Sequence, residues 1–170
     1  MDRKPTVSVI IPVYNAQDYI DLTITSVIEQ SYTDWELIIV DDGSTDGSSN
    51  IIKNFVNIDN RIRTVRLDKS TGGPAYPRNV GMKEANGDYL AFLDADDIWD
   101  KDKLKLQIDY ITKSEIDFLH CDAEYIDNMG KKSGVIKKSK FYSVLRKIFG
   151  DSFAILAINP ITLSSCIVKN

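Results

Sequence analysis

The feature that most constrains this fold is the alternation of short apolar segments with amphipathic ones. Apolar runs typical of strands buried on both faces occupy residues 7–13, 35–40 and 89–93. Apolar residues at helical spacing predict helices over 19–30, across Ile51 to Val56, and from Pro77 to about Ala85. Such alternation with short connections indicates βαβ units. The sequence therefore predicts an α/β fold with a mostly parallel central sheet and helices on both faces.

The ends of these elements carry their own signals. Asn15, with Asp18 three residues later, has the spacing of a helix N-cap and its capping box. Gly87 suits the end of the helix before it, because glycine is common just after a helix. Asp100 is a candidate cap for a lysine-rich helix that bears Leu104 and Ile111. Further strands are expected over 62–67, 118–126 and 162–168, and an amphipathic helix over 141–149.

Size and composition favour one soluble domain. The chain has 170 residues, 43% hydrophobic and 27% charged, and a net charge of -4, which gives no reason to expect nucleic-acid binding. Its two cysteines are too few for a disulfide framework and fit a reducing compartment. No apolar run approaches the roughly 20 residues that cross a bilayer. A cytoplasmic location is expected.

Carboxylates follow two of the predicted strand ends, where ligands bind in open α/β sheets. These residues are Asp41, Asp42, Asp94, Asp96 and Asp97. Crowded carboxylates repel one another unless a cation offsets them, and Mg²⁺ or Mn²⁺ prefers oxygen ligands. Neither a Gly-x-Gly-x-x-Gly fingerprint nor a Gly-x-x-x-x-Gly-Lys-Ser/Thr loop occurs. A diphosphate carried by the ligand would complete such a metal site, whereas the simpler alternative is that the acidic residues only cap the next helix.

At this point the sequence resembles family 2 of the inverting glycosyltransferases, which have the Rossmann-like A-type glycosyltransferase (GT-A) fold. The resemblance extends over about residues 7–115. The matching motifs, in family order, are Val7-Ser8-Val9-Ile10-Ile11-Pro12-Val13-Tyr14-Asn15, Glu36-Leu37-Ile38-Ile39-Val40-Asp41-Asp42-Gly43-Ser44-Thr45-Asp46, Gly72-Gly73-Pro74-Ala75, Arg78-Asn79-x-Gly81 and Gly87-Asp88-Tyr89-Leu90-Ala91-Phe92-Leu93-Asp94-Ala95-Asp96-Asp97.

The resemblance implies a role for each of several residues. Pro12 and Tyr14 would line the nucleobase pocket, and Asp41 would accept a hydrogen bond from a uracil-type base. Arg78 would approach the base or the diphosphate, and Asp94 would face the ribose. Asp96 would hold the Mn²⁺ or Mg²⁺ that bridges the diphosphate of the donor. Asp97 would either ligate through water or, as we expect, cap the following helix.

The resemblance also implies a general base for the acceptor hydroxyl, supplied by a carboxylate well downstream of the acidic loop. We expect this base beyond Asn170, so that residues 1–115 form the nucleotide-sugar-binding part and 116–170 an incomplete start of the acceptor side. Asp122, Glu124 and Asp127 are weaker candidates for the base. The chain would then bind a uridine diphosphate sugar but transfer little or no sugar.

The expected partners are a nucleotide-sugar donor and a glycan or lipid-linked acceptor, in the assembly of bacterial surface polysaccharides. A lysine-rich segment, 131–147, could contact an anionic membrane at its inner face, although a solvated surface helix is the simpler interpretation. Two rival functions stay open. One is a donor-binding module without transfer activity, and the other is a metal-dependent phosphatase or nucleotidyltransferase that uses Asp94 and Asp96.

Overall fold

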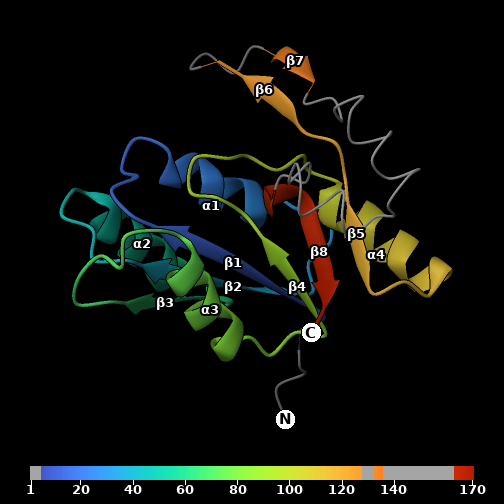
Figure 1. Cartoon of the computed structure of the whole chain (residues 1–170), viewed down its shortest axis with the longest axis horizontal. Helices are drawn as coiled ribbons and strands as arrows, with labels where there is room; N and C mark the ends of the chain where they lie inside the picture. The colour runs from blue at the N-terminus through green and yellow to red at the C-terminus, as the bar shows by residue number, and fades with distance from the viewer. Residues whose placement is uncertain (1–4, 128–131, 136–162) are drawn as a thin grey trace, which may run out of the picture.

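A six-stranded sheet forms the centre of the structure, a computed structural model that describes residues 5–127, 132–135 and 163–170 (Figure 1). Its spatial order is β3-β2-β1-β4-β8-β5. The strands are β1 (Val7–Val13), β2 (Trp35–Asp41), β3 (Ile62–Arg66), β4 (Tyr89–Phe92), β5 (Phe118–His120) and β8 (Cys166–Lys169).

The first four strands are parallel and the C-terminal one is not. β1 pairs in parallel with β2 and β4, and β2 pairs in parallel with β3. β8 lies between β4 and β5 and is antiparallel to both. The predicted mostly parallel α/β sheet is therefore confirmed. The strand expected over 162–168 also exists, but its first part is the short 3₁₀ helix η1 (Leu163–Ser165).

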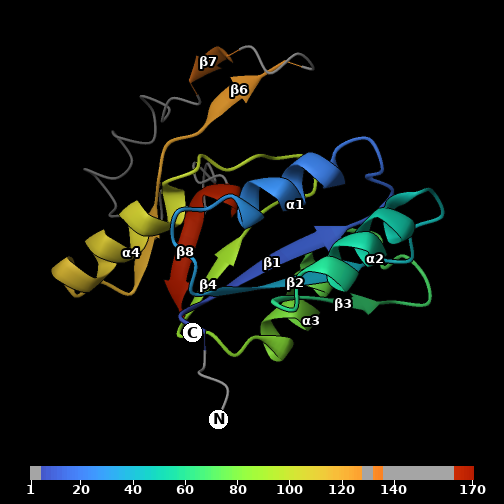
Figure 2. The ribbon, with the colours of Figure 1, turned by 180° about the vertical axis from the view of Figure 1, so that it is seen from behind.

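Helices cover both faces of this sheet, as Figures 1 and 2 show together. Helices α1 (Ile20–Ile28) and α2 (Ser48–Ile58) lie on one face, and α3 (Ala75–Glu84) lies on the other. Helix α4 (Lys103–Ser114) lies on the same side as α1 and packs near β5.

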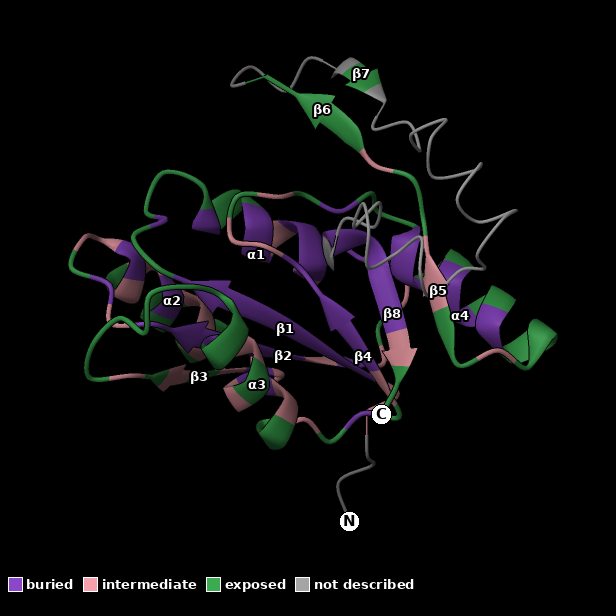
Figure 3. Ribbon diagram, in the orientation of Figure 1, coloured by how far each residue is buried: buried purple, intermediate pink, exposed green. Residues whose placement is uncertain are grey.

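β1 is buried along its whole length, as its colour in Figure 3 shows, and its successive side chains point to opposite faces of the sheet. Val9 and Ile11 belong to the larger core, with apolar residues of α1, α2 and α4. Ile10 points the other way, into a smaller cluster with Leu90 and Phe92 that is packed against α3. Because both faces of the strand are covered, the sequence of β1 is apolar at nearly every position.

Several predicted helix ends are wrong in detail. Asn15 does not cap α1, which begins at Ile20, and has instead a left-handed backbone with φ of 48°. Asp97 and Asp100 both precede the N-cap position of α4, which is Asp102. Gly87 lies beyond the end of α3 and not in the left-handed region. A Cβ atom there would lie 2.5 Å from the backbone nitrogen of Ser8, so close approach to β1 is what requires glycine.

The strand predicted over 118–126 is divided in two. β5 ends at His120, and the last contact with its neighbour is the Cys121 amide, which donates to the Ser165 carbonyl at 3.3 Å. At that point the neighbouring chain becomes η1, so no strand remains for residues 121–123 to pair with. β6 (Glu124–Ile126) pairs instead with β7 (Lys132–Val135) in a separate two-stranded sheet.

Two other predictions cannot be compared with the fold. The helix expected over 141–149 lies outside the described residues, as does the basic segment 131–147 apart from β7. Within the described ranges, no helix combines the length and the apolar character that crossing a bilayer requires.

Candidate functional site

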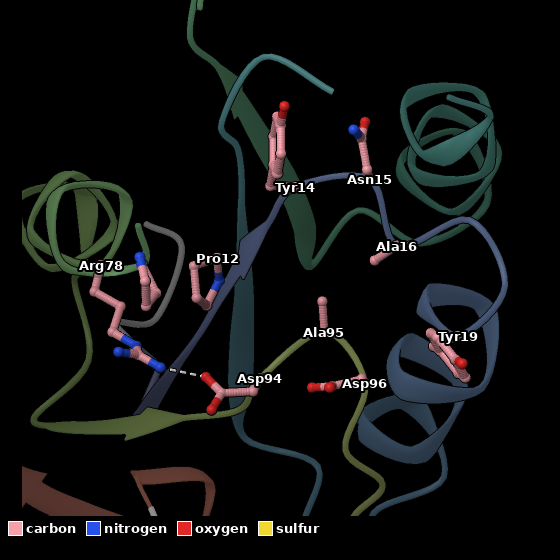
Figure 4. A pocket seen from close by; sticks show the side chains of 10 residues that line it. Pro12, Tyr14, Asn15, Ala16, Tyr19, Arg78, Asp94, Ala95 and Asp96 are labelled. Carbon is pink, nitrogen blue, oxygen red and sulfur yellow. Dashed lines mark hydrogen bonds and ion pairs between the residues drawn. The ribbon is translucent and has the colours of Figure 1, made fainter. Parts of the chain in front are cut away.

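An open cleft of about 300 Å³ lies at the carboxyl ends of β1 and β4, where ligands bind in open α/β sheets (Figure 4). Three segments form its walls: the end of β1 with the loop that follows, the start of α3, and the loop after β4. The lining residues are Pro12, Tyr14, Asn15, Ala16, Tyr19, Pro74, Arg78, Asp94, Ala95 and Asp96.

The loop after β1 is held by the loop after β2. The side-chain oxygen of Asn15 accepts a hydrogen bond from the Thr45 amide at 2.8 Å, and the Asn15 amide donates to the Ser44 hydroxyl at 3.1 Å. The Ala16 amide donates to the Ser48 hydroxyl at 2.9 Å. These bonds explain the left-handed backbone of Asn15, a conformation that asparagine tolerates better than most residues. They also leave Tyr14 free of the core, with 52% of its surface exposed at the mouth of the cleft.

Arg78 and Asp94 meet across the floor of the cleft. A guanidinium nitrogen, Nη2, of Arg78 forms an ion pair with the Asp94 carboxylate. The Arg78 Nε atom is buried and has no hydrogen-bond partner among the residues that the structure describes. The Arg78 side chain is 17% exposed and lines the cleft, where a planar guanidinium can pair with the oxygens of an anion.

The acidic loop, residues 94–97, is a tight turn with fixed ends. The Asp97 amide donates to the Asp94 carbonyl at 3.1 Å, and the Ala95 carbonyl accepts from the Thr23 hydroxyl at 2.8 Å. Asp96 is exposed, and Figure 4 shows its carboxylate directed toward the side of the cleft where Asp94 lies.

Asp97 does not line the cleft, and its carboxylate is hydrogen-bonded to Ser164. Burial is the main reason that the pKa of Asp97 is raised above its ordinary value, and the charges of Asp96 and Asp94 raise it further against the opposing Ser164 bond. The expectation that Asp97 caps the next helix is therefore wrong. Burial contributes most to the raised pKa of Asp97, and the like charges of Asp96 and Asp94, which the sequence predicts for this loop, add to it.

Asp41 and Asp42 are buried and absent from the cleft lining. The Asp41 carboxylate accepts from the Ser44 amide at 2.8 Å and also contacts Ser49 and Arg66. Burial alone would raise the pKa of Asp41, but the bonds from Ser44 and Ser49 and the Arg66 charge hold it below its ordinary value.

Asp42 makes its hydrogen bonds with the loop before α3. Its carboxylate accepts from the Thr71 amide at 2.9 Å and from the Ser70 hydroxyl at 3.0 Å, which ties down the loop before α3. The predicted cluster of five strand-end carboxylates is thus divided, and only Asp94 and Asp96 face the cleft.

Five of the six residues singled out from the sequence come together here: Pro12, Tyr14, Arg78, Asp94 and Asp96. Asp41 is the exception, because it contacts Arg66 on β3. Asp122, Glu124 and Asp127, the weaker candidates for a base, are exposed and do not line the cleft. Two residues of the site are not predicted from the sequence: Tyr19, which follows the β1 loop and lines the cleft, and Ser164, which is hydrogen-bonded to the acidic loop.

Comparison with known proteins decides the family. The model of glycosyl transferase family 2 matches residues 8–159, most of the chain. The chain belongs to glycosyltransferase family 2. Among its relatives, TuaG of Bacillus subtilis is 49% identical over 115 residues, a match covering 68% of this chain and 45% of that protein.

Another relative of this family 2 member is WfgD of Escherichia coli, named as a UDP-Glc:alpha-D-GlcNAc-diphosphoundecaprenol beta-1,3-glucosyltransferase. It is 40% identical over 122 residues, which cover 72% of this chain and 47% of WfgD. The chain spans about half the length of these two relatives.

The fold comparison agrees. The crystal structure of Staphylococcus aureus TarS 1-349 in complex with UDP-GlcNAc matches with a TM-score of 0.69 and 32% identity, over 75% of this chain and 37% of that one. The GT-A architecture is therefore confirmed for the described part of the chain.

Proposed function

We propose that the cleft binds a nucleotide-diphospho-sugar, with uridine as the nucleoside, as the donor for a glycosyl transfer with inversion. The observation that carries this proposal is the juxtaposition of Arg78, Asp94 and Asp96 in one cleft at the strand edge. The UDP-GlcNAc complex of the related TarS protein supports the choice of donor class.

The two ends of the cleft suit the two ends of such a donor. Pro12 and the exposed Tyr14 offer an apolar surface and an aromatic face, on which a base can stack. Arg78 lies deeper, where its planar guanidinium can pair with diphosphate oxygens. Asp94 would accept hydrogen bonds from ribose hydroxyls, because an ionised carboxylate is an acceptor only.

The donor set fits a hard divalent cation, Mn²⁺ or Mg²⁺. Asp96 would hold the ion, close to Asp94, and no group of three or more acidic, cysteine or histidine ligands exists among the described residues. Such an ion often takes one or two protein carboxylates and completes its coordination with phosphate oxygens and water. When bound, a divalent cation stabilises the negative charge that develops on a departing diphosphate.

The roles of this chain's residues in transfer would be binding and orientation. Arg78 would neutralise part of the diphosphate charge. The hydrogen-bonded acidic loop, residues 94–97, would fix the orientation of the donor sugar. The acceptor hydroxyl needs a general base on the opposite face of the sugar ring. Within the described residues, the cleft has no carboxylates besides Asp94 and Asp96, so we infer that the base comes from outside this cleft.

The acceptor is proposed as a glycan or a lipid-linked sugar of the bacterial cell surface, in line with the names of the relatives. The rival proposal is a module that binds the donor without transferring the sugar. Both proposals predict the same donor binding. Only the first predicts a glycoside product when the protein, a UDP-sugar and a lipid-linked acceptor are combined.

Calorimetric titration of the protein with UDP, UDP-GlcNAc and UDP-glucose, each with and without Mn²⁺, tests the donor site. We expect binding that is tighter with Mn²⁺ and a melting temperature that rises with ligand concentration, because only the folded state binds. Absence of nucleotide binding under every condition would refute the proposed function.

Asp96→Asn provides the matched test of the metal role. Because Asp96 is exposed, the variant should melt as the unaltered protein does but lose the Mn²⁺-dependent gain in affinity. Asp109→Asn, on the exposed face of α4, is the control for the change of charge and should bind normally.

A further inference from the structure

The segment 163–165 lies directly behind the acidic loop, although about seventy residues separate the two in the chain. Ser164 is 7% exposed, and its hydroxyl accepts a hydrogen bond from the Asp94 amide at 3.0 Å. The same side chain is hydrogen-bonded to the Asp97 carboxylate. A hydroxyl has one proton to donate and lone pairs to accept with, so Ser164 can serve both partners at once.

Ser164 is itself held in place through the backbone of η1. The indole Nε1 of Trp99 donates to the Ser164 carbonyl at 2.8 Å. The side-chain nitrogen Nε2 of Gln107 donates to the Ser165 carbonyl at 2.9 Å. Trp99 and Gln107 are both buried, so these bonds are shielded from water.

Lys103 completes this support. Its ammonium group donates to the Gln107 side-chain oxygen at 2.7 Å and lies 4.0 Å from the centre of the Trp99 ring. The side chains of Trp99 and Gln107, which donate to η1, are therefore both held in place by Lys103, a buried residue of α4.

The acidic loop is consequently attached at three of its four residues. Ser164 binds the amide of Asp94 and the side chain of Asp97, and Thr23 binds the carbonyl of Ala95. The remaining residue, Asp96, has its carboxylate in the cleft. Binding groups hold their geometry best when neighbours lock the backbone that carries them.

We propose that Ser164 is a positioning residue, which sets the orientation of Asp94 and Asp96 for the donor and its cation. The inference rests on the function proposed above. It assigns to the C-terminal segment, which lines no part of the cleft, a share in the strength of metal-dependent donor binding.

The test compares Ser164→Ala with Ser164→Thr, which keeps the hydroxyl, and with Ser165→Ala as the neighbouring control. The Ser165 side chain is hydrogen-bonded to Cys166, and its carbonyl bond to Gln107 survives the substitution. Two quantities are measured: UDP affinity with and without Mn²⁺ by calorimetry, and amide hydrogen exchange of residues 93–98 by mass spectrometry.

We expect Ser164→Ala to weaken Mn²⁺-dependent UDP binding roughly 10- to 100-fold, the usual effect of removing a supporting partner of a metal site. Metal-free UDP binding should weaken less than Mn²⁺-dependent binding, because only the contacts of Asp94 are then affected, and exchange of the Asp94 amide should accelerate. Ser164→Thr should restore both properties, and Ser165→Ala should change neither.

Equal Mn²⁺-dependent affinity of Ser164→Ala and the unaltered protein would overturn the inference and leave the proposed function intact. If the unaltered protein binds no UDP, the proposed function fails and the inference fails with it. If Ser164→Ala does not fold, Ser164→Cys takes its place, because a thiol of similar size is a weak hydrogen-bond partner.

Discussion

Two adjacent carboxylates at the end of β2 show how a single residue's role depends on the face to which it points. Asp41 and Asp42 are neighbours in the sequence, yet successive side chains of a strand point to opposite faces. Asp41 joins Ser49 of α2 to Arg66 of β3, and Asp42 holds the loop at Thr71. Both carboxylates therefore hold neighbouring loops and strands together, and neither is among the lining residues of the cleft.

Asp41→Asn should destabilise the fold by about 1–3 kcal/mol at neutral pH, because it weakens a buried set of hydrogen bonds to a charged group. The depressed pKa of Asp41 sets the pH dependence. A carboxyl that ionises more readily when folded adds stability above its ordinary pKa of about 4, and this is lost as the pH falls through the lower folded value.

Urea unfolding of both proteins between pH 7 and pH 2 measures this effect. The difference in the free energy of unfolding should shrink at the acid end of the range. Asp109→Asn serves as the exposed control and should follow the unaltered protein throughout. A difference for Asp41→Asn that stays constant down to the lowest pH would show that ionisation of Asp41 contributes nothing.

At the scale of elements, the cleft depends on close contacts between loops and strands. The loop after α3 runs against β1, where the Gly87 amide donates to the Ser8 hydroxyl at 2.8 Å. The same hydroxyl donates to the Glu36 carboxylate at 2.6 Å, so β1, β2 and this loop meet at one point. This contact sets where β4 begins, and hence where the acidic loop after β4 emerges.

Gly87→Ala should therefore be costly. Its added methyl group would lie 2.5 Å from the backbone nitrogen of Ser8, and the backbone of a central strand cannot easily move. We expect a loss of about 1–3 kcal/mol, the usual range for overpacking.

Gly73→Ala is the matched control, because a Cβ atom at Gly73 would meet nothing within 4 Å. Thermal unfolding of the two variants measures the difference. Equal melting temperatures for Gly87→Ala and Gly73→Ala would contradict the steric explanation.

The elements that follow from local pattern were predictable, and those that depend on distant contacts were not. The apolar run of β1 and the spacing of α1 lie within the sequence itself, and the strand-end position of Asp94 and Asp96 follows from them. No local pattern shows that residues 121–123 have no strand to pair with, or that Ser164 meets the Asp94 amide. The capping prediction for Asn15 is wrong because the Asn15 side chain binds the β2–α2 loop, and these distant hydrogen bonds prevail over the local pattern.

For the whole molecule, the C-terminal strand is part of the core. β8 fills the space between β4 and β5, and Ile167 is fully buried in the larger hydrophobic cluster. The parallel half of the sheet and β5 are thus joined by a strand that comes from the far end of the described chain.

Ile167→Ala should cost about 2–5 kcal/mol, as large-to-small substitutions at fully buried positions usually do. Val168→Ala should cost less, because Val168 is only partly buried against the smaller cluster. Chemical denaturation followed by fluorescence gives both values. If the denaturant concentration at the unfolding midpoint is the same for Ile167→Ala and the unaltered protein, β8 unfolds separately from the rest of the sheet.

The position of β8 also determines the order in which the chain can fold. β1 to β4 lie within the first 92 residues, so their parallel pairing can be established while the rest of the chain is still being synthesised. Until residues 166–169 arrive, the edge of β4 that pairs with β8 is open and can accept a strand from another molecule. Pairing over such a sequence separation is slow. A nascent chain is therefore exposed to aggregation at this edge until β8 pairs with β4. The same pairing brings Ser164 to the acidic loop.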